Sequence, residues 1–165
     1  MENIPNINTE NIRKTDHFCP TGSTAVLVTD QFQCERLIRA GRVVADIAGT
    51  DLYILNIQNN EYPTNPEAIQ HLFDVSSHNQ GAMQLLYSDN AYKTICQYIK
   101  NNKVSCVVSG MPAGENSILH KIWGKFTHVH FFTVNDEGRM EEVIHRKTHG
   151  IPSKEAKTPS PESIQ

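Results

Sequence analysis

Two glycines near residue 110 form the part of the sequence best suited to bind a ligand. Gly110 and Gly114 stand in a turn that starts at Ser109, and the polar residues Glu115 and Asn116 follow it. Glycines let the backbone come close to a phosphate, and the unpaired amides of a helix's first turn point towards an anion. The spacing predicts an anion-binding turn, but a plain strand-to-helix connection has the same residue types.

The segments on either side of this turn are those that would hold it in place. Residues 104–108 form an apolar, β-branched run that is typical of a buried strand. Residues 118–123 carry apolar side chains at helical spacing, and the polar residues at 115–117 are favoured at a helix start. We therefore expect a strand, a turn and a helix in succession.

The same alternation of apolar strands and amphipathic helices continues through most of the chain. We expect strands at 24–29, 51–57, 83–87, 104–108 and 127–134, and helices at 33–48, 66–79, 91–101 and from about 116 to 125. Gly49 is a C-cap candidate, and Asn65 before Pro66 has the pattern of a helix N-cap. Short connections between parallel strands predict an α/β fold, a doubly wound five-stranded parallel sheet in a single domain.

This topology predicts where a ligand would bind. In doubly wound sheets the site lies beyond the carboxyl ends of the strands, where the winding direction reverses. The strand ending at Asp30 and the strand ending at Gly110 are the expected neighbours at that reversal. The glycine turn would then open into the crevice between them.

The remaining segments indicate the domain boundaries, and the composition limits the classes of function. We expect a flexible arm at 1–22, the folded domain at 23–147 and a disordered tail at 148–165, with 140–147 either an edge strand or a short helix. The net charge of -3 gives no reason to expect nucleic-acid binding. The polar N-terminus and the absence of a long apolar run predict a cytoplasmic protein without membrane insertion. The cysteines and histidines lack the spacing of a closed metal site, so none is predicted.

One run of residues resembles a known family. The sequence Glu-Arg-Leu-Ile-Arg-Ala-Gly-Arg-Val-Val-Ala, which starts at Glu35, resembles the first helix of the universal stress protein (UspA-like) fold. It is most similar to the stress-protein-like domain of potassium-sensor histidine kinases, and the resemblance extends over residues 24–134. It implies a Rossmann-like fold of the adenine nucleotide alpha hydrolase-like type. It also implies a regulatory module that binds ATP or another adenine nucleotide, with or without Mg²⁺, and has no dedicated catalytic step.

The ATP-binding members of this family carry a glycine signature after strand four. It reads Gly, two residues, Gly, nine residues, Gly and then Ser or Thr. Here three residues, including Pro112, separate Gly110 from Gly114, and nine residues separate Gly114 from Gly124. Lys125 replaces the hydroxyl residue and is either a phosphate contact or a solvated surface lysine.

The resemblance implies further contacts at the ends of strands one and two. Thr29 and Asp30 follow strand one, where the family places an acidic residue near the adenine or ribose. Asn56, Ile57 and Gln58 end strand two, where backbone groups would meet the adenine. The alternative for Asp30 is a role as the cap of the first helix.

Other functions remain open on the sequence alone. The altered glycine spacing also fits a signalling or interaction module whose ligand site has decayed. A slow ATPase or another nucleotide-handling enzyme is a second alternative, although no Walker A sequence is present. A phospho-receiver would need paired acids after strand one, where Asp30 stands alone. The Ser-x-Ser pattern of cyclic di-AMP-binding relatives is also absent at Thr29.

The resemblance also implies partners. Family members often form homodimers through strand five, which here would start at Thr127 and end at Val134. A regulatory module would also have a signalling partner, which the sequence does not identify.

Overall fold

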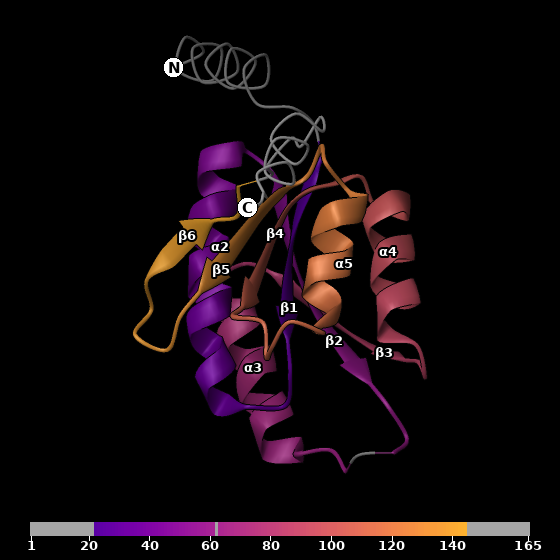
Figure 1. The fold of residues 1–165 in the computed structure, drawn as a ribbon. Helices are drawn as coiled ribbons and strands as arrows, with labels where there is room; N and C mark the ends of the chain where they lie inside the picture. The colour runs from indigo at the N-terminus through magenta and orange to yellow at the C-terminus, as the bar shows by residue number, and fades with distance from the viewer. Residues whose placement is uncertain (1–21, 62, 145–165) are drawn as a thin grey trace, which may run out of the picture.

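Six strands form one sheet in the order β3-β2-β1-β4-β5-β6, and helices cover both of its faces (Figure 1). This computed structural model describes residues 22–61 and 63–144. The elements in chain order are β1 (Ser23–Val28), the 3-10 helix η1 (Phe32–Cys34), α2 (Glu35–Ala48), β2 (Asp51–Gln58), α3 (Pro66–His78), β3 (Ala82–Tyr87), α4 (Ala91–Asn101), β4 (Val104–Gly110), α5 (Ile118–Lys125), β5 (His130–Val134) and β6 (Met140–Glu142).

The winding direction reverses between β1 and β4, as the sequence predicted. β1 pairs in parallel with both β2 and β4, so the chain runs outwards from β1 in two directions. β3 and β5 extend the sheet in parallel on either side. The carboxyl ends of β1 and β4 therefore lie side by side at one edge of the sheet.

The structure contains a sixth strand, β6, which the predicted five-stranded sheet lacks. β6 pairs antiparallel with β5, with Phe132 opposite Glu142, after a turn in which the Gly138 amide donates to the Asn135 carbonyl at 2.9 Å. β6 has only three residues, Met-Glu-Glu, so it has no apolar pattern by which the sequence could distinguish a strand from a helix. β5 also begins at His130 and not at Thr127, because residues 127–129 form a turn.

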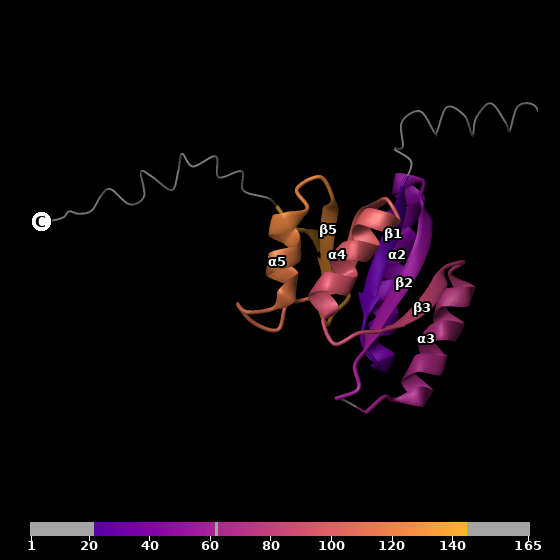
Figure 2. The same ribbon diagram turned by 90° about the vertical axis from the view of Figure 1, so that its right-hand side faces the viewer.

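Two helices pack against each face of the sheet (Figure 2). On one face, α2 and α3 bury Ile38 and Leu72 against β1 and β2. On the other face, α4 and α5 bury Ile99 and Ile122 against β4 and β5. Gly41 has no room for a side chain, because a Cβ there would collide with Val26 of β1. This close contact fixes α2 directly over β1.

The predicted helix ends are confirmed where a local cap defines them. The Asn65 side chain accepts a hydrogen bond from the Ala68 amide at 3.2 Å, with Pro66 at the first helical position. Gly49 ends α2 in the left-handed conformation with φ of 71°. Asn90 caps α4, and its side chain accepts from the Lys93 amide at 3.0 Å.

Several predictions concern residues that the structure does not describe. The arm predicted at 1–22, except for Gly22, and the tail predicted at 148–165 lie outside the described residues. Within the described ranges, none of the helices combines the length and the apolar character that crossing a bilayer requires.

Candidate functional site

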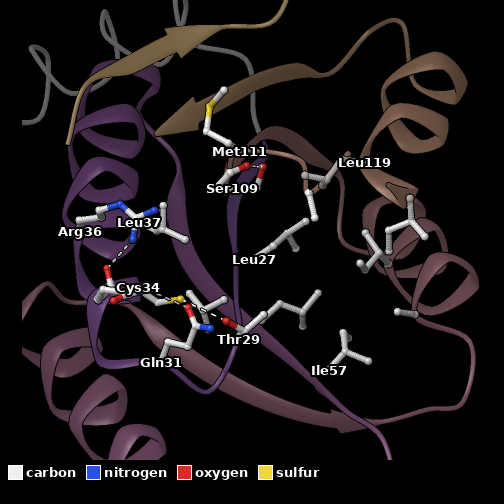
Figure 3. A pocket seen from close by; sticks show the side chains of 18 of the residues that line it. Leu27, Thr29, Gln31, Cys34, Arg36, Leu37, Ile57, Ser109, Met111 and Leu119 are labelled. Atoms are coloured by element: carbon white, nitrogen blue, oxygen red, sulfur yellow. Dashed lines mark hydrogen bonds between the residues drawn. The ribbon is translucent and has the colours of Figure 1, made fainter. Parts of the chain in front are cut away.

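A cleft of about 530 Å³ opens at the carboxyl ends of β1 and β4 (Figure 3). It lies between the start of α2 on one side and the starts of α4 and α5 on the other. The volume is within the range of small-molecule sites in proteins. Its lining residues are Leu27, Val28, Thr29, Gln31, Gln33, Cys34, Arg36, Leu37, Leu55, Ile57, Ala91, Ile95, Ser109, Gly110, Met111, Ala113, Ile118, Leu119 and Asp136.

The wall towards α4 and α5 is apolar. Leu27 and Ile57 come from the ends of two strands, and Ile95, Ile118 and Leu119 come from the first turns of the two helices or shortly beyond. Figure 3 shows Leu27, Ile57 and Leu119 on this side, across from Arg36 on α2. Such a wall suits the flat apolar body of a ligand, because burial of that body there removes apolar surface from water.

The wall towards α2 carries the charge. Arg36 Nε donates to the Asn135 carbonyl at 2.8 Å, and Arg36 Nη1 donates to the Gln33 carbonyl at 2.7 Å. Arg36 Nη2 lies 3.5 Å from Asp136 Oδ1, and Asp136 is almost fully exposed. Arg36 thus links the start of α2 to the turn between β5 and β6. Among the lining residues it is the one cation.

The cleft also contains two hydroxyls and a thiol. Thr29 Oγ1 lies 3.5 Å from Cys34 Sγ, and Ser109 Oγ donates to the Gly110 carbonyl at 3.0 Å. Within the described part of the chain, none of the three is hydrogen-bonded to a carboxylate or an imidazole that would serve as a base.

Three of the predicted site residues form a separate polar group beside the cleft. We call Asp30, Asn56, Gln58 and Asn65 the Asp30 cluster. Asp30 Oδ1 accepts from Asn56 Nδ2 at 3.0 Å and from Gln58 Nε2 at 2.8 Å, while Asp30 Oδ2 accepts from the Asn65 amide at 3.2 Å. The cluster ties the ends of β1 and β2 to the segment before α3. Asp30 does not cap the first helix, because Gln31 is the N-cap of η1.

The glycine turn reaches the cleft at only one of its two glycines. Gly110 lines the cleft with Ser109, and a Cβ added at Gly110 would lie 3.8 Å from Arg36 Nη2. Gly114 has φ of 152° and open space around it, and the neighbouring Glu115 and Asn116 are exposed. The structure does not place these three among the lining residues.

The last part of the predicted glycine signature lies away from the cleft. Gly124 and Lys125 are in the last turn of α5, whereas the N-cap of that helix, Ser117, precedes Ile118. At about 1.5 Å per residue, roughly 10 Å of helix separates the two ends. The structure thus separates these two residues from the cleft, because the Ser117 side chain accepts from the Leu119 amide and starts the helix at its other end.

Two charged lining residues, Arg36 and Asp136, were not predicted from the sequence. Arg36 belongs to the run from which the family resemblance was drawn, but it was not predicted to line the cleft. Segments that follow the carboxyl ends of the strands border the crevice in this topology, and Arg36 lies in the first turn of α2, the helix that follows β1 and η1. That rule would have identified Arg36. Asp136 follows the carboxyl end of β5 and satisfies the same rule.

A hydrogen-bonded triad supports η1 at the mouth of the cleft. His71 Nε2 lies 2.6 Å from Glu35 Oε1, and Arg39 Nη2 donates to Glu35 Oε2 at 2.5 Å. The hydrogen bond with His71, followed by that with Arg39, holds the pKa of Glu35 below its ordinary value. The Phe32 ring lies beside His71, with 5.2 Å between the ring centroids. These contacts join α3 to the segment that carries Gln31 and Gln33.

Comparisons with known proteins identify the fold. No protein-family model matches the chain, and no curated protein sequence matches it significantly. Among solved structures, the universal stress protein from Archaeoglobus fulgidus in complex with dAMP has a TM-score of 0.53 at 14% identity, with 69% of this chain and 96% of that chain covered. A second structure of universal stress protein from the same organism has a TM-score of 0.51 at 16% identity, with 69% and 92% covered. A protein of the universal stress protein family from Burkholderia pseudomallei has a TM-score of 0.50 at 12% identity, with 68% and 95% covered.

At these identities the similarity concerns the fold and not the function. The matched structures are covered almost completely, so the alternation of strands and helices is shared over nearly their whole length. The reversal between β1 and β4, with two helices on each face, agrees with the fold that the family resemblance implied. The chain therefore has the α/β fold of the universal stress proteins, with a short antiparallel strand added at one edge of the sheet.

Proposed function

We propose that this protein is a universal stress protein-like regulatory module that binds an adenine nucleotide in the cleft between β1 and β4. The observation that carries the proposal is the cleft itself. It has about 530 Å³ of space at the point where the winding reverses, with one apolar wall and one polar wall. That the similarly folded Archaeoglobus fulgidus protein is described in complex with dAMP supports an adenine nucleotide as the ligand.

The two walls suggest how the ligand would lie. The adenine would pack against Leu27 and Ile57, and its polar edge would face Thr29 at the rim. The phosphate would lie towards Ser109 and Gly110, where the lack of a side chain at Gly110 lets the backbone come close. The Asp30 cluster would position the ends of β1 and β2 without contacting the ligand.

The proposal covers adenine nucleotides as a class. ATP, with or without Mg²⁺, is what the family resemblance implied, and that expectation relied in part on Gly124 and Lys125. Because both lie at the far end of α5, the support for a triphosphate rests on the turn after β4 alone. ATP therefore has to be compared directly with shorter nucleotides.

A titration tests the proposal. Adenosine, AMP, ADP and ATP, the last with and without Mg²⁺, are each added to the full chain, and binding is measured by calorimetry and by thermal shift. A ligand that binds only the folded state should raise the free energy of unfolding by about 2.7 kcal/mol at a hundred times its dissociation constant. The absence of any shift at millimolar concentrations of all four compounds would refute the proposal.

Two matched glycine variants locate the site. Gly110→Val places a side chain in the cleft at ordinary contact distance from Arg36 and Leu37, so it should weaken binding while the fold is retained. Gly124→Val adds the same side chain at a position with nothing within 4 Å, so binding should be unchanged. If Gly124→Val weakened binding and Gly110→Val did not, the glycine signature would be the better guide and the proposed cleft would be wrong.

The exposed apolar rim favours a second candidate, an interaction module that uses the cleft without a nucleotide. Met111 lines the cleft and is 57% exposed, next to the half-buried Ile118 and Leu119. An apolar side chain of a signalling partner would suit this rim. If no nucleotide binds and Met111→Gln abolishes capture of a partner, this second function is favoured.

The predicted homodimer through strand five faces a structural obstacle. In the described residues, β5 pairs with β4 on one side and with β6 on the other, so neither of its backbone edges is free. A dimer of this kind would have to displace β6 or use side chains alone. Sedimentation velocity of the full chain, with and without nucleotide, tests whether a dimer forms.

A further inference from the structure

The charged groups of the cleft indicate a narrower ligand class, and this inference rests on the proposed function. We propose that Arg36 binds the phosphate of a nucleoside monophosphate, and that Asp136 competes with that phosphate for the same guanidinium group. Arg36 would then determine specificity, because it would separate a monophosphate from both the uncharged nucleoside and the triphosphate.

The geometry of Arg36 leaves one edge of its guanidinium for a ligand. Two backbone carbonyls, those of Asn135 and Gln33, accept from Nε and Nη1 at 2.8 and 2.7 Å and hold the group in place. Nη2 points towards the end of β4, where a Cβ on Gly110 would lie 3.8 Å away. A pre-positioned guanidinium loses little conformational entropy when it binds a phosphate oxygen.

The charge balance of the cleft favours a single phosphate. Its lining residues include one cation, Arg36, and one carboxylate, Asp136. A guanidinium forms strong charge-assisted hydrogen bonds with one phosphate group. The additional phosphates of ATP would find no second lining cation, because Lys125 lies at the far end of α5. Charge that is moved out of water without a partner lowers affinity.

Asp136 is placed where a ligand phosphate can replace it. Its contact with Arg36 Nη2 is long, at 3.5 Å, and its side chain is 99% exposed. Exposed ion pairs of this kind contribute little to stability, so the contact is easily broken. The carboxylate also repels a phosphate that approaches the same nitrogen. Removal of its charge should therefore strengthen the binding of an anion but not that of adenosine.

The experiment compares adenosine, AMP and Mg²⁺-free ATP by calorimetry on four full-length proteins: wild type, Arg36→Gln, Asp136→Asn and Lys100→Gln. Wild type should bind AMP about tenfold more tightly than adenosine, the effect of one charged hydrogen-bonded contact, and more tightly than ATP. Arg36→Gln should bring the ratio of AMP to adenosine affinity close to one. Asp136→Asn should raise the AMP affinity several-fold without affecting adenosine. Lys100→Gln, a neutralisation of an exposed lysine in the last turn of α4 and outside the cleft lining, should change neither affinity.

Each failure has a separate meaning. If none of the three compounds binds to wild type, the proposed function is wrong. If adenosine and AMP bind wild type equally, or if Arg36→Gln leaves their ratio unchanged, the nucleotide site stands and the role of Arg36 is overturned. Tighter binding of ATP than of AMP would also overturn the preference for a single phosphate. Arg36 links the start of α2 to the turn after β5, so Arg36→Gln could destabilise the fold. Arg36→Lys is therefore a second variant, which retains the positive charge. It should keep part of the AMP preference even if Arg36→Gln is unstable.

Discussion

Two polar regions lie next to each other at the carboxyl end of β1, and they use their polar groups in opposite ways. In the Asp30 cluster, the carboxylate is hydrogen-bonded to two side-chain amides and one backbone amide of the same chain. In the cleft, Arg36 keeps one edge of its guanidinium beside open space, with only a long contact to an exposed carboxylate. Thr29 lines the cleft, whereas the adjacent Asp30 belongs to the Asp30 cluster.

The type of a polar residue therefore does not tell whether its hydrogen bonds are completed within the protein or left open towards a cleft. Asn56 and Gln58 are buried, so their amides need acceptors within the protein, and Asp30 supplies one. Once satisfied in this way, they hold strands together and have little capacity left for a ligand. The polar groups of the cleft border about 530 Å³ of space, so a ligand can complete their hydrogen bonds.

The largest expected effect comes from removing the acceptor at the centre of the Asp30 cluster. Asp30→Ala leaves the side-chain amides of the buried Asn56 and Gln58 without their shared carboxylate. Asn56 Nδ2 keeps the Val28 carbonyl at 3.3 Å and Gln58 Nε2 keeps Asn56 Oδ1, so the loss is that of the hydrogen bonds to the charged acceptor. Such bonds contribute about 1.5–3 kcal/mol each, so we expect a loss of about 2–4 kcal/mol in the free energy of unfolding. Urea denaturation monitored by circular dichroism measures it.

The neighbouring residue provides the control for this prediction. Thr29→Ala removes a hydroxyl that is exposed and has only a 3.5 Å contact with Cys34, so its effect should stay within about 0.5 kcal/mol. If both variants lost the same stability, the division into a structural region and a binding region would not hold at this end of β1.

A smaller effect of opposite sign is expected at Tyr98, which is buried outside both regions. Its hydroxyl has no hydrogen-bond partner within the described part of the chain, and burial raises the pKa of Tyr98 to about 12. In the described residues, the hydroxyl is therefore neither hydrogen-bonded to a protein acceptor, as in the Asp30 cluster, nor placed at the lining of the cleft, where a ligand could bind it. Tyr98→Phe should raise the free energy of unfolding by about 1 kcal/mol, seen as a higher thermal midpoint. A lower midpoint would mean that the hydroxyl does have a partner.

The smallest effect concerns the triad at the mouth of the cleft. The pKa of Glu35 is lowered in the folded protein, chiefly by its hydrogen bond with His71. A lowered pKa adds stability above the ordinary pKa of the carboxyl, and this stability is lost as the pH falls through the folded value. Since the group is partly exposed, wild type should exceed Glu35→Gln by only about 0.2–1 kcal/mol at neutral pH. Denaturation between pH 3 and 7 should show the difference shrinking as the pH falls below about 4.3, the ordinary pKa of a glutamate carboxyl, towards the lower pKa of the folded state. A constant difference would argue against the ionised triad.

Much of the fold could be predicted from the sequence, because local interactions define its elements. Asn65 before Pro66 starts α3, and Gly49 ends α2, through contacts within a few residues. The alternation of strands and helices then implied the reversal between β1 and β4. In the same way, Thr29, Ile57, Ser109 and Gly110 were expected at the crevice, and the structure brings them to the lining of one cleft.

The rest was decided by contacts between distant parts of the chain. Arg36 meets Asn135 across 99 positions of sequence, and no local pattern reports such a contact. β6 is defined as a strand by its pairing with β5, because three residues carry no periodicity of their own. Spacing alone also could not show that Asp30 is satisfied internally. Caps and apolar periodicity act within a few residues, so the helices, the five parallel strands and the place of the reversal could be predicted from them, whereas β6 could not. Which polar groups face the cleft depends on the partners that folding brings within hydrogen-bond distance, so it becomes visible only in the folded chain.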